Sequence, residues 1–262
     1  MSLPCETDSL VKALVPASDA TPADWVVAGL RGFAESVESI VPAGFASYVR
    51  VFHPAYRRGG DSSRSVRWAE VAAANQKSAH VGMQFDVLIG SDDLYNFAPQ
   101  PGVFDQALRV GSLPREQIEL LVPVLGRHTA TPQTCWFGSW EGWGDIRADV
   151  ASAPKFQPAP RSYHLLAGTI ESAGESMSEH SEQSASVWWS DDHAWCVATE
   201  IDFDTTYVGC DELCRDEILR IPDVEAFVVD PTAHGYEAGD IPEHWRTRDS
   251  RLPGRGSGRS SA

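Results

Sequence analysis

The sequence predicts an α+β fold with a largely antiparallel sheet flanked by three to four helices. Helix and strand patterns are mixed along the 262 residues, without the regular strand–helix repeat of a doubly wound fold. Near the end, two strand patterns flank the polar segment 190–193 (SDDH), which is typical of a hairpin. The second pattern, 194–203, begins with apolar residues on both faces, so we expect this strand at the centre of the sheet.

The first half of the chain contains three predicted helices and one clear strand. Thr21 and Pro22 form a helix start, and apolar residues then recur at helical spacing as far as Ile40. A strand is predicted over 45–52, a flexible basic loop over 57–64 and a helix over 66–76. The segment 84–89 is interpreted as a strand, and a third helix begins at Leu113 and is kinked or ended by Pro123.

The second half is richer in predicted strands. Strand patterns cover 135–140, 163–170, the hairpin 187–203 and 225–230. A final helix follows Gly209, with Cys210, Leu213, Cys214, Ile218 and Ile221 on one face. Residues 171–186 are rich in serine and glutamate and lack a hydrophobic period, so we expect a solvated loop there.

The domain organisation follows from composition. Residues 1–20 are predicted to be a loose leader and 21–245 a single α+β domain. A candidate internal boundary lies near 150–161, where the chain has three prolines. The segment 246–262 is rich in arginine, glycine and serine and is predicted to be disordered.

Charge is the strongest compositional feature. The chain has 21 basic and 37 acidic residues, a net charge of −16, and 161–245 alone has 3 basic and 19 acidic residues. This balance argues against nucleic acid and anionic membranes as partners. No apolar run approaches the roughly 20 residues of a membrane span. Residues 1–15 do not resemble a secretory signal, and the five scattered cysteines suit reduced thiols, so we expect a cytoplasmic protein.

Two groups of residues are candidate sites. Glu200, Asp202 and Asp204 alternate along the predicted strand, so their carboxylates would share one side and could hold a cation or exchange protons. The alternative is a solvated outer face, which we favour. The second group lies in the glycine-rich segment 136–144, where aromatic faces could stack on a ligand and an acid could anchor it. Its candidate ligand-binding residues are Trp136, Trp140, Glu141 and Trp143, with inward packing of the tryptophans as the alternative.

Neither a metal site nor a cofactor site is predicted. The sequence has no zinc-ligand spacing, dinucleotide fingerprint, phosphate loop or nucleophile elbow. Cys210 and Cys214 are one helical turn apart, but their expected helix face also carries Ile218, so we interpret them as buried thiols.

Three stretches of the chain carry a resemblance: CWFGSWEGWGD (135–145), SVWWSDDHAWCVATEIDFDTTYVG (186–209) and the segment 24–57. They resemble segments of a conserved family of actinobacterial proteins of unknown function. The resemblance covers about half of the chain and implies an intracellular protein in which residues 22–245 form one unit. It implies no catalytic residue.

These observations favour a non-enzymatic protein whose acidic block, 161–245, binds a basic protein partner, as immunity proteins bind basic toxins. The alternative is a small-molecule binder or hydrolase, metal-assisted or not, with a pocket at 136–145. The sequence leaves catalysis and oligomeric state open.

Overall fold

A large antiparallel sheet organises the chain. The structure is a computed structural model that describes residues 13–33, 36–59, 62–91 and 97–233. The strand order is β1-β7-β5-β8-β9-β10-β2-β11, and β6 pairs with β7 beside β1. The predicted α+β class with a largely antiparallel sheet is confirmed. The strands of this sheet are β1 (Val15–Pro16), β2 (Ser47–Phe52), β5 (Cys135–Trp140), β6 (Lys155–Phe156), β7 (Tyr163–Gly168), β8 (Val187–Ser190), β9 (Cys196–Ala198), β10 (Thr205–Cys210) and β11 (Ala226–Val228).

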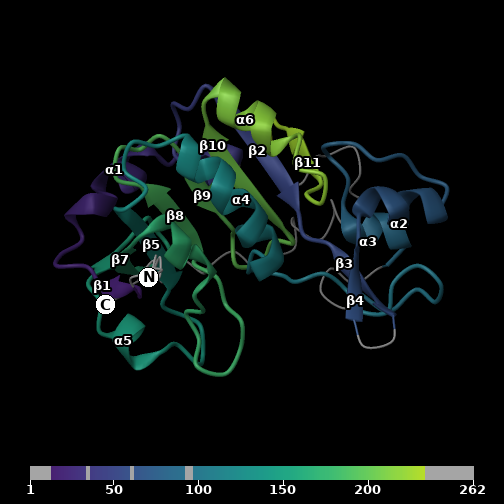
Figure 1. The fold of residues 1–262 in the computed structure, drawn as a ribbon, viewed down its shortest axis with the longest axis horizontal. Helices are drawn as coiled ribbons and strands as arrows, with labels where there is room; N and C mark the ends of the chain where they lie inside the picture. Colours follow the sequence, from purple (N-terminus) through teal and green to yellow (C-terminus); the bar gives the residue numbers. More distant parts are fainter. Residues whose placement is uncertain (1–12, 34–35, 60–61, 92–96, 234–262) are drawn as a thin grey trace, which may run out of the picture.

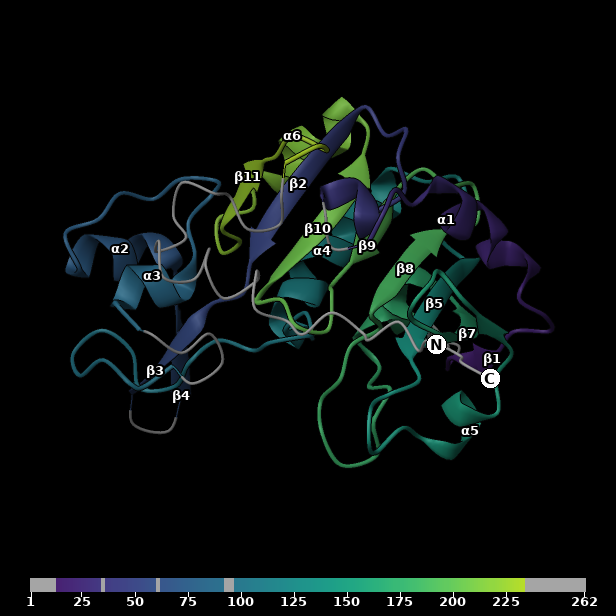
Figure 2. The ribbon, with the colours of Figure 1, turned by 180° about the vertical axis from the view of Figure 1, so that it is seen from behind.

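Helices cover both faces of the sheet. On one face α4, α6 and α5 pack over a core that includes Leu121, Trp188 and Ile218 (Figure 1). On the other face lie α1 and two short 3-10 helices, η1 and η2, over a second core that includes Tyr207 (Figure 2). The helices of the described chain are α1 (Asp24–Gly29), α2 (Trp68–Ala74), α3 (Phe85–Ile89), α4 (Arg115–Arg127), α5 (Ala148–Ala151) and α6 (Glu212–Ile218), with the 3-10 helices η1 (Thr21–Ala23), η2 (Val37–Ser39) and η3 (Ile170–Gly174).

A smaller lobe lies beyond one end of β2 and corrects two expectations (Figure 1). The expected basic loop 57–64 is largely a hairpin of β3 (Ala55–Gly59) and β4 (Ser62–Val66). The expected strand 84–89 is mostly the helix α3, which ends at Gly90 in the left-handed conformation. A short apolar run does not distinguish a strand from a helix, and here the run buries Phe85 in the separate core of this lobe.

The predicted first helix is much shorter than its apolar spacing suggests. Residue Leu30 is extended, and α1 ends at Gly29. A Cβ at Gly29 would lie 2.7 Å from the Cβ of Pro42, so close packing against that proline requires the glycine. The second half of the expected helix is replaced by η2, and the sheet face beside α1 is left incompletely covered by helix.

Two expectations about the second half are also wrong. The segment 171–186 is not a solvated loop throughout, because η3 begins it and residues 183–186 are buried. The strand expected over 194–203 is central, but β9 ends at Ala198, and residues 199–204 form the turn to β10. Glu200, Asp202 and Asp204 therefore do not alternate along a strand.

The remaining expectations about segments have mixed outcomes. The strands at 45–52, 135–140 and 163–170 correspond to β2, β5 and β7, and the last helix corresponds to α6. Helix α4 continues through Pro123. Within the candidate boundary 150–161, β6 pairs with β7. Residues 1–12 of the predicted leader and the whole predicted tail, 246–262, lie outside the described residues.

Candidate functional site

A cavity lies where the shortened α1 leaves the sheet face. Its volume is about 210 Å³, and it is bounded by α1, η2 and residues of β6, β7, β8 and β9. We call it the apolar cavity, because most of its lining is aliphatic or aromatic. These apolar lining residues are Val26, Val27, Leu30, Phe33, Ile40, Phe156, Pro158, Ala159, Tyr163, Val187 and Ala198.

The polar end of the apolar cavity is built on Arg161, two residues before β7. Its Nη2 lies 2.5 Å from Oε1 of Glu200 and 3.3 Å from Oδ2 of Asp202. The side chains of Arg161 and Glu200 are each only 17% exposed, whereas Asp202 is 54% exposed. The turn between β9 and β10 thus supplies two carboxylates to one guanidinium.

Aromatic rings hold the same arginine in place. The guanidinium carbon lies 5.6 Å from the ring centre of Phe33 and 5.6 Å from that of Trp140. These are cation–π distances, and partial burial strengthens such contacts. Trp140 in turn packs edge-to-face with Trp143 at 5.2 Å. Arg161 is therefore contacted from three parts of the chain. These are Phe33 in the segment after α1, Trp140 in β5, and the two acids in the turn between β9 and β10.

One donor of this arginine is not satisfied. Its Nε is buried and has no hydrogen-bond partner among the described residues. A buried donor without a partner costs about 1–3 kcal/mol, and because protein atoms enclose this nitrogen, it is an internal cost and not a group exposed to the cavity. Burial also raises the pKa of Glu200, an effect that Arg161 opposes, and raises the pKa of Tyr163.

The structure brings together only some of the predicted site residues. Trp140, Glu200 and Asp202 meet at Arg161. Trp136 lies elsewhere, with its Nε1 donating to Asp191 at 2.8 Å.

Two other predicted residues of the glycine-rich segment are also occupied or enclosed. Glu141 forms an ion pair with Lys155 at 2.8 Å, and this hydrogen bond lowers the pKa of the glutamate. Trp143 has its Nε1 buried without a partner among the described residues.

Asp204 is separated from the other two acids of the predicted row. Burial raises its pKa to about 6, and the nearby Arg50 partly opposes this effect. Arg50 is itself buried and donates to the carbonyl of Val81 and to the hydroxyl of Thr205. This carboxylate belongs to the junction with the smaller lobe, not to the apolar cavity.

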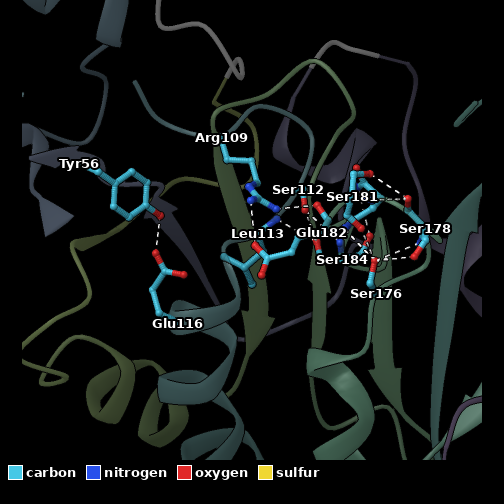
Figure 3. A network of polar contacts seen from close by, with 11 residues as sticks. Tyr56, Arg109, Ser112, Leu113, Glu116, Ser176, Ser178, Ser181, Glu182 and Ser184 are labelled. Atoms are coloured by element: carbon cyan, nitrogen blue, oxygen red, sulfur yellow. Dashed lines mark hydrogen bonds and ion pairs between the residues drawn. The ribbon is translucent and has the colours of Figure 1, made fainter. Parts of the chain in front are cut away.

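A second, larger cavity lies between the β3–β4 hairpin and α4. Its volume is about 600 Å³, and we call it the polar cavity, because Tyr56, Gln106, Arg109, Glu116 and Glu182 contribute to its lining. The Tyr56 hydroxyl donates to Glu116, and Arg109 Nη2 lies 2.9 Å from Glu182 (Figure 3). Each charged lining residue therefore has a partner.

Metal and membrane sites were sought in the same part of the chain. Among the described residues, no group of three or more His, Cys, Asp or Glu side chains is placed to hold a metal ion. The four described cysteines are buried free thiols. In the described ranges, every helix is too short or too polar to cross a bilayer.

Sequence reasoning missed Arg161 and the apolar cavity. The sequence did contain a signal for Arg161. The segment 161–245 has 19 acidic residues and only three basic ones, and Arg161 is one of the three. An isolated base in an acidic segment has carboxylates to pair with, but the sequence does not show which ones fold next to it.

Comparisons with known proteins assign no role to these residues. No family model, no curated protein and no solved structure matches the chain. The resemblance to actinobacterial proteins stays a prediction.

Proposed function

We propose that the protein binds a small, mainly apolar molecule in the apolar cavity. The observation that carries the proposal is a cavity of about 210 Å³ that is lined mostly by apolar residues and that has Arg161 and Glu200 among its lining residues. Ligand sites typically combine apolar walls with a few placed polar groups. An apolar cavity of about 150 Å³ can hold benzene, so one ring or a short aliphatic group fits this volume.

The rim supports access by an apolar ligand. Val27 is 39% exposed and Phe33 is 46% exposed, although both line the cavity. Large apolar side chains that are exposed at the edge of a cavity give an apolar ligand a favourable surface to contact. Two other lining residues, Ala198 and Phe156, are buried, so the lining extends from partly exposed to buried apolar side chains.

The proposal is tested with benzyl alcohol, which has one ring and one hydroxyl. Titration of the full chain, followed by ¹H–¹⁵N NMR, should give saturable shifts at cavity-lining amides with a dissociation constant of about 1 mM. The variant Ala198→Leu fills the cavity and should abolish these shifts. Ala107→Leu makes the same change in the lining of the polar cavity and should leave them intact. A wild type without saturable shifts, or an Ala198→Leu variant that binds as wild type does, contradicts the proposal.

Binding of a basic protein by the acidic block is the other proposal, and the described ion pairs favour it less. Four of the 19 block acids pair with arginines from residues 1–160, so the segregation of charge along the chain is partly neutralised in the fold. Pairs of this kind include Arg67–Asp223, Arg109–Glu182, Arg127–Glu217 and Arg147–Glu175. Salt-sensitive capture of the chain on a basic protein surface, unaffected by Ala198→Leu, would favour this second proposal over the first.

A further inference from the structure

One wall of the apolar cavity is formed by α1, whose Val26 and Val27 line it together with the following Leu30. The helix has six residues, its N-terminus has no side-chain cap, and Val26 is its buried residue. A helix of this length is not stable without contacts to the rest of the protein. Since α1 lies at the end of the molecule opposite the smaller lobe (Figure 2), its contacts with the sheet determine whether this wall stays in place.

A stacked pair of rings joins α1 to the turn between β8 and β9. The ring of Trp25 lies 4.1 Å from the imidazole of His193, with an angle of 20° between the two planes. Burial lowers the pKa of His193, so the imidazole is uncharged at pH 7.5. Trp25 also packs edge-to-face on Trp189 of β8 at 6.1 Å. Trp189 is fully buried, whereas His193 is exposed, so the stack is the outer of the two contacts.

The turn that carries His193 is fixed by hydrogen bonds to other parts of the chain. Asp192 accepts from the amide of Ala130 at 2.7 Å, and Asp191 accepts from Nε1 of Trp136 at 2.8 Å. These bonds connect the turn to β5 and to the segment before it. The position of His193 is therefore set independently of α1.

The closed position of α1 has two energetic costs. His193 has a φ of 57°, which places its backbone in the left-handed region that residues with a Cβ adopt at a cost. Nε1 of Trp25 is buried and has no hydrogen-bond partner among the described residues, although water would satisfy it if α1 moved away. Strain of this kind is concentrated at ligand clamps and switch segments. Both costs favour a helix that opens while the sheet stays folded.

We propose that α1 is a gate of the apolar cavity and that the stack of His193 on Trp25 is the latch that keeps it closed. When the two rings separate, α1 leaves the sheet together with Val26 and Val27, and a ligand enters or leaves through the wall that they formed. This inference rests on the proposed function, because it describes how a ligand reaches the same cavity.

The amide of Leu30 reports the opening of α1. It donates to the carbonyl of Val26 at 3.1 Å, and this hydrogen bond breaks when α1 leaves the sheet and unfolds. The amide of Asn75 at the end of α2 is its counterpart, because it donates to the carbonyl of Val71 at the same distance in the smaller lobe. Exchange of both amides with water is measured by NMR on the full chain at pH 7.5.

Two matched variants test the latch. His193→Asn removes the stacking ring, and asparagine tolerates the left-handed conformation. The exchange rate of the Leu30 amide should rise by about three- to tenfold, whereas the rates in β10 should not change. Gln76→Asn is the control, because Gln76 has the same φ of 57° but follows α2 in the smaller lobe. It should leave the Leu30 rate at its wild-type value.

Benzyl alcohol tests the gate. If a ligand leaves when α1 opens, a bound ligand reduces the population of the open state by mass action. Benzyl alcohol at about ten times its dissociation constant should therefore slow exchange of the Leu30 amide by about tenfold in the wild type. The rate of the Asn75 amide should not change, because this residue does not line the apolar cavity.

The outcomes separate the gate from the proposed function. Saturable NMR shifts with benzyl alcohol and an unchanged Leu30 rate overturn the gate and leave the proposed function standing. An absence of saturable shifts overturns both. A Leu30 rate that does not change in His193→Asn, or that rises together with the rates in β10, overturns the latch.

Discussion

The two cavities differ in a way that volume does not reveal. The polar cavity is nearly three times larger, about 600 Å³ against 210 Å³. Its lining charges are satisfied within the protein, since Tyr56 donates to Glu116 and Arg109 pairs with Glu182 (Figure 3). The apolar cavity instead is lined mostly by apolar residues, and its two charged lining residues, Arg161 and Glu200, pair with each other. The difference teaches that the character of the lining, and not the empty volume, favours the smaller cavity as the site for an apolar ligand.

The surroundings of the polar cavity are also consistent with a structural role. The hydroxyl of Ser184 accepts from the amide of Leu113, and the hydroxyl of Ser112 accepts from the amide of Ser184 (Figure 3). These bonds join the loop after η3 to the start of α4. Serine side chains here replace the backbone partners that a regular element would supply.

The largest expected effect lies behind the polar cavity, at His53. The ring contacts the carbonyl oxygen of Arg109 and the hydroxyl of Thr206, and burial lowers its pKa to about 4. The unfolded state binds a proton near pH 6.5, so the contribution of neutral His53 is full above that pH and is lost as pH falls towards 4. This loss amounts to about 3 kcal/mol.

A His53→Gln variant should lack that component. The difference in unfolding free energy between wild type and variant, measured with urea at pH 7.5 and pH 4.5, should shrink by about 2 kcal/mol at the lower pH. Benzyl alcohol binding at pH 7.5 should not change, because His53 is outside the apolar cavity. A pH-independent difference would contradict the assigned pKa of His53.

Asp204 should act in the opposite direction. Its pKa is raised to about 6, so the folded state holds a proton more tightly than the unfolded state does. The contribution of protonated Asp204 to the free energy of unfolding is therefore full below about pH 3.8 and is lost as the pH rises through 6. In Asp204→Asn, the gain in unfolding free energy relative to wild type should be about 2 kcal/mol larger at pH 7.5 than at pH 4. Equal gains at both pH values would show that Asp204 titrates normally.

The two cavities can be compared directly through their arginines. Arg161→Ala leaves Glu200 largely buried without its cation and should lower the unfolding free energy by about 2 kcal/mol. Arg109→Ala breaks a pair whose acid, Glu182, is 63% exposed, and should cost less than about 1 kcal/mol. Chemical denaturation at pH 7.5 measures both. A larger cost for Arg109→Ala would reverse the distinction between the cavities.

The smallest effect is expected at the rim of the polar cavity. Tyr56→Phe removes only the hydroxyl that donates to Glu116 and should cost about 0.5–1 kcal/mol. It should not alter the affinity for benzyl alcohol, which titration calorimetry can check. A loss of binding in this variant would place the ligand in the polar cavity instead.

Much of the fold was predictable because it depends on local patterns. The strands at 45–52, 135–140 and 163–170 and the central position of β9 follow from apolar and β-branched runs. The length of α1 was not predictable, since the chain becomes extended at Leu30, directly after Gly29 packs closely against Pro42, thirteen positions later. The helical spacing of apolar residues continues to Ile40, but the helix itself does not.

The site was predictable only in its components. Trp140, Glu200 and Asp202 were recognised as candidates, but in two unrelated groups. Their meeting point, Arg161, depends on the β5–β7 pairing and on the turn after β9, which together bring residues 140, 161 and 200–202 into contact. A strand that continued to residue 203 would group Asp204 with Glu200 and Asp202. Because β9 ends at Ala198, Asp204 instead lies near Arg50.

The central claim is that the apolar cavity, and not the larger polar cavity, receives the ligand. A crystal structure of the full chain soaked with benzyl alcohol tests it most directly. We expect ring density between Val26 and Tyr163, with the hydroxyl group towards the end of the cavity that holds Arg161 and Glu200. Density beside Arg109 and Glu116, or an apolar cavity that excludes the ring at saturating benzyl alcohol, would contradict it.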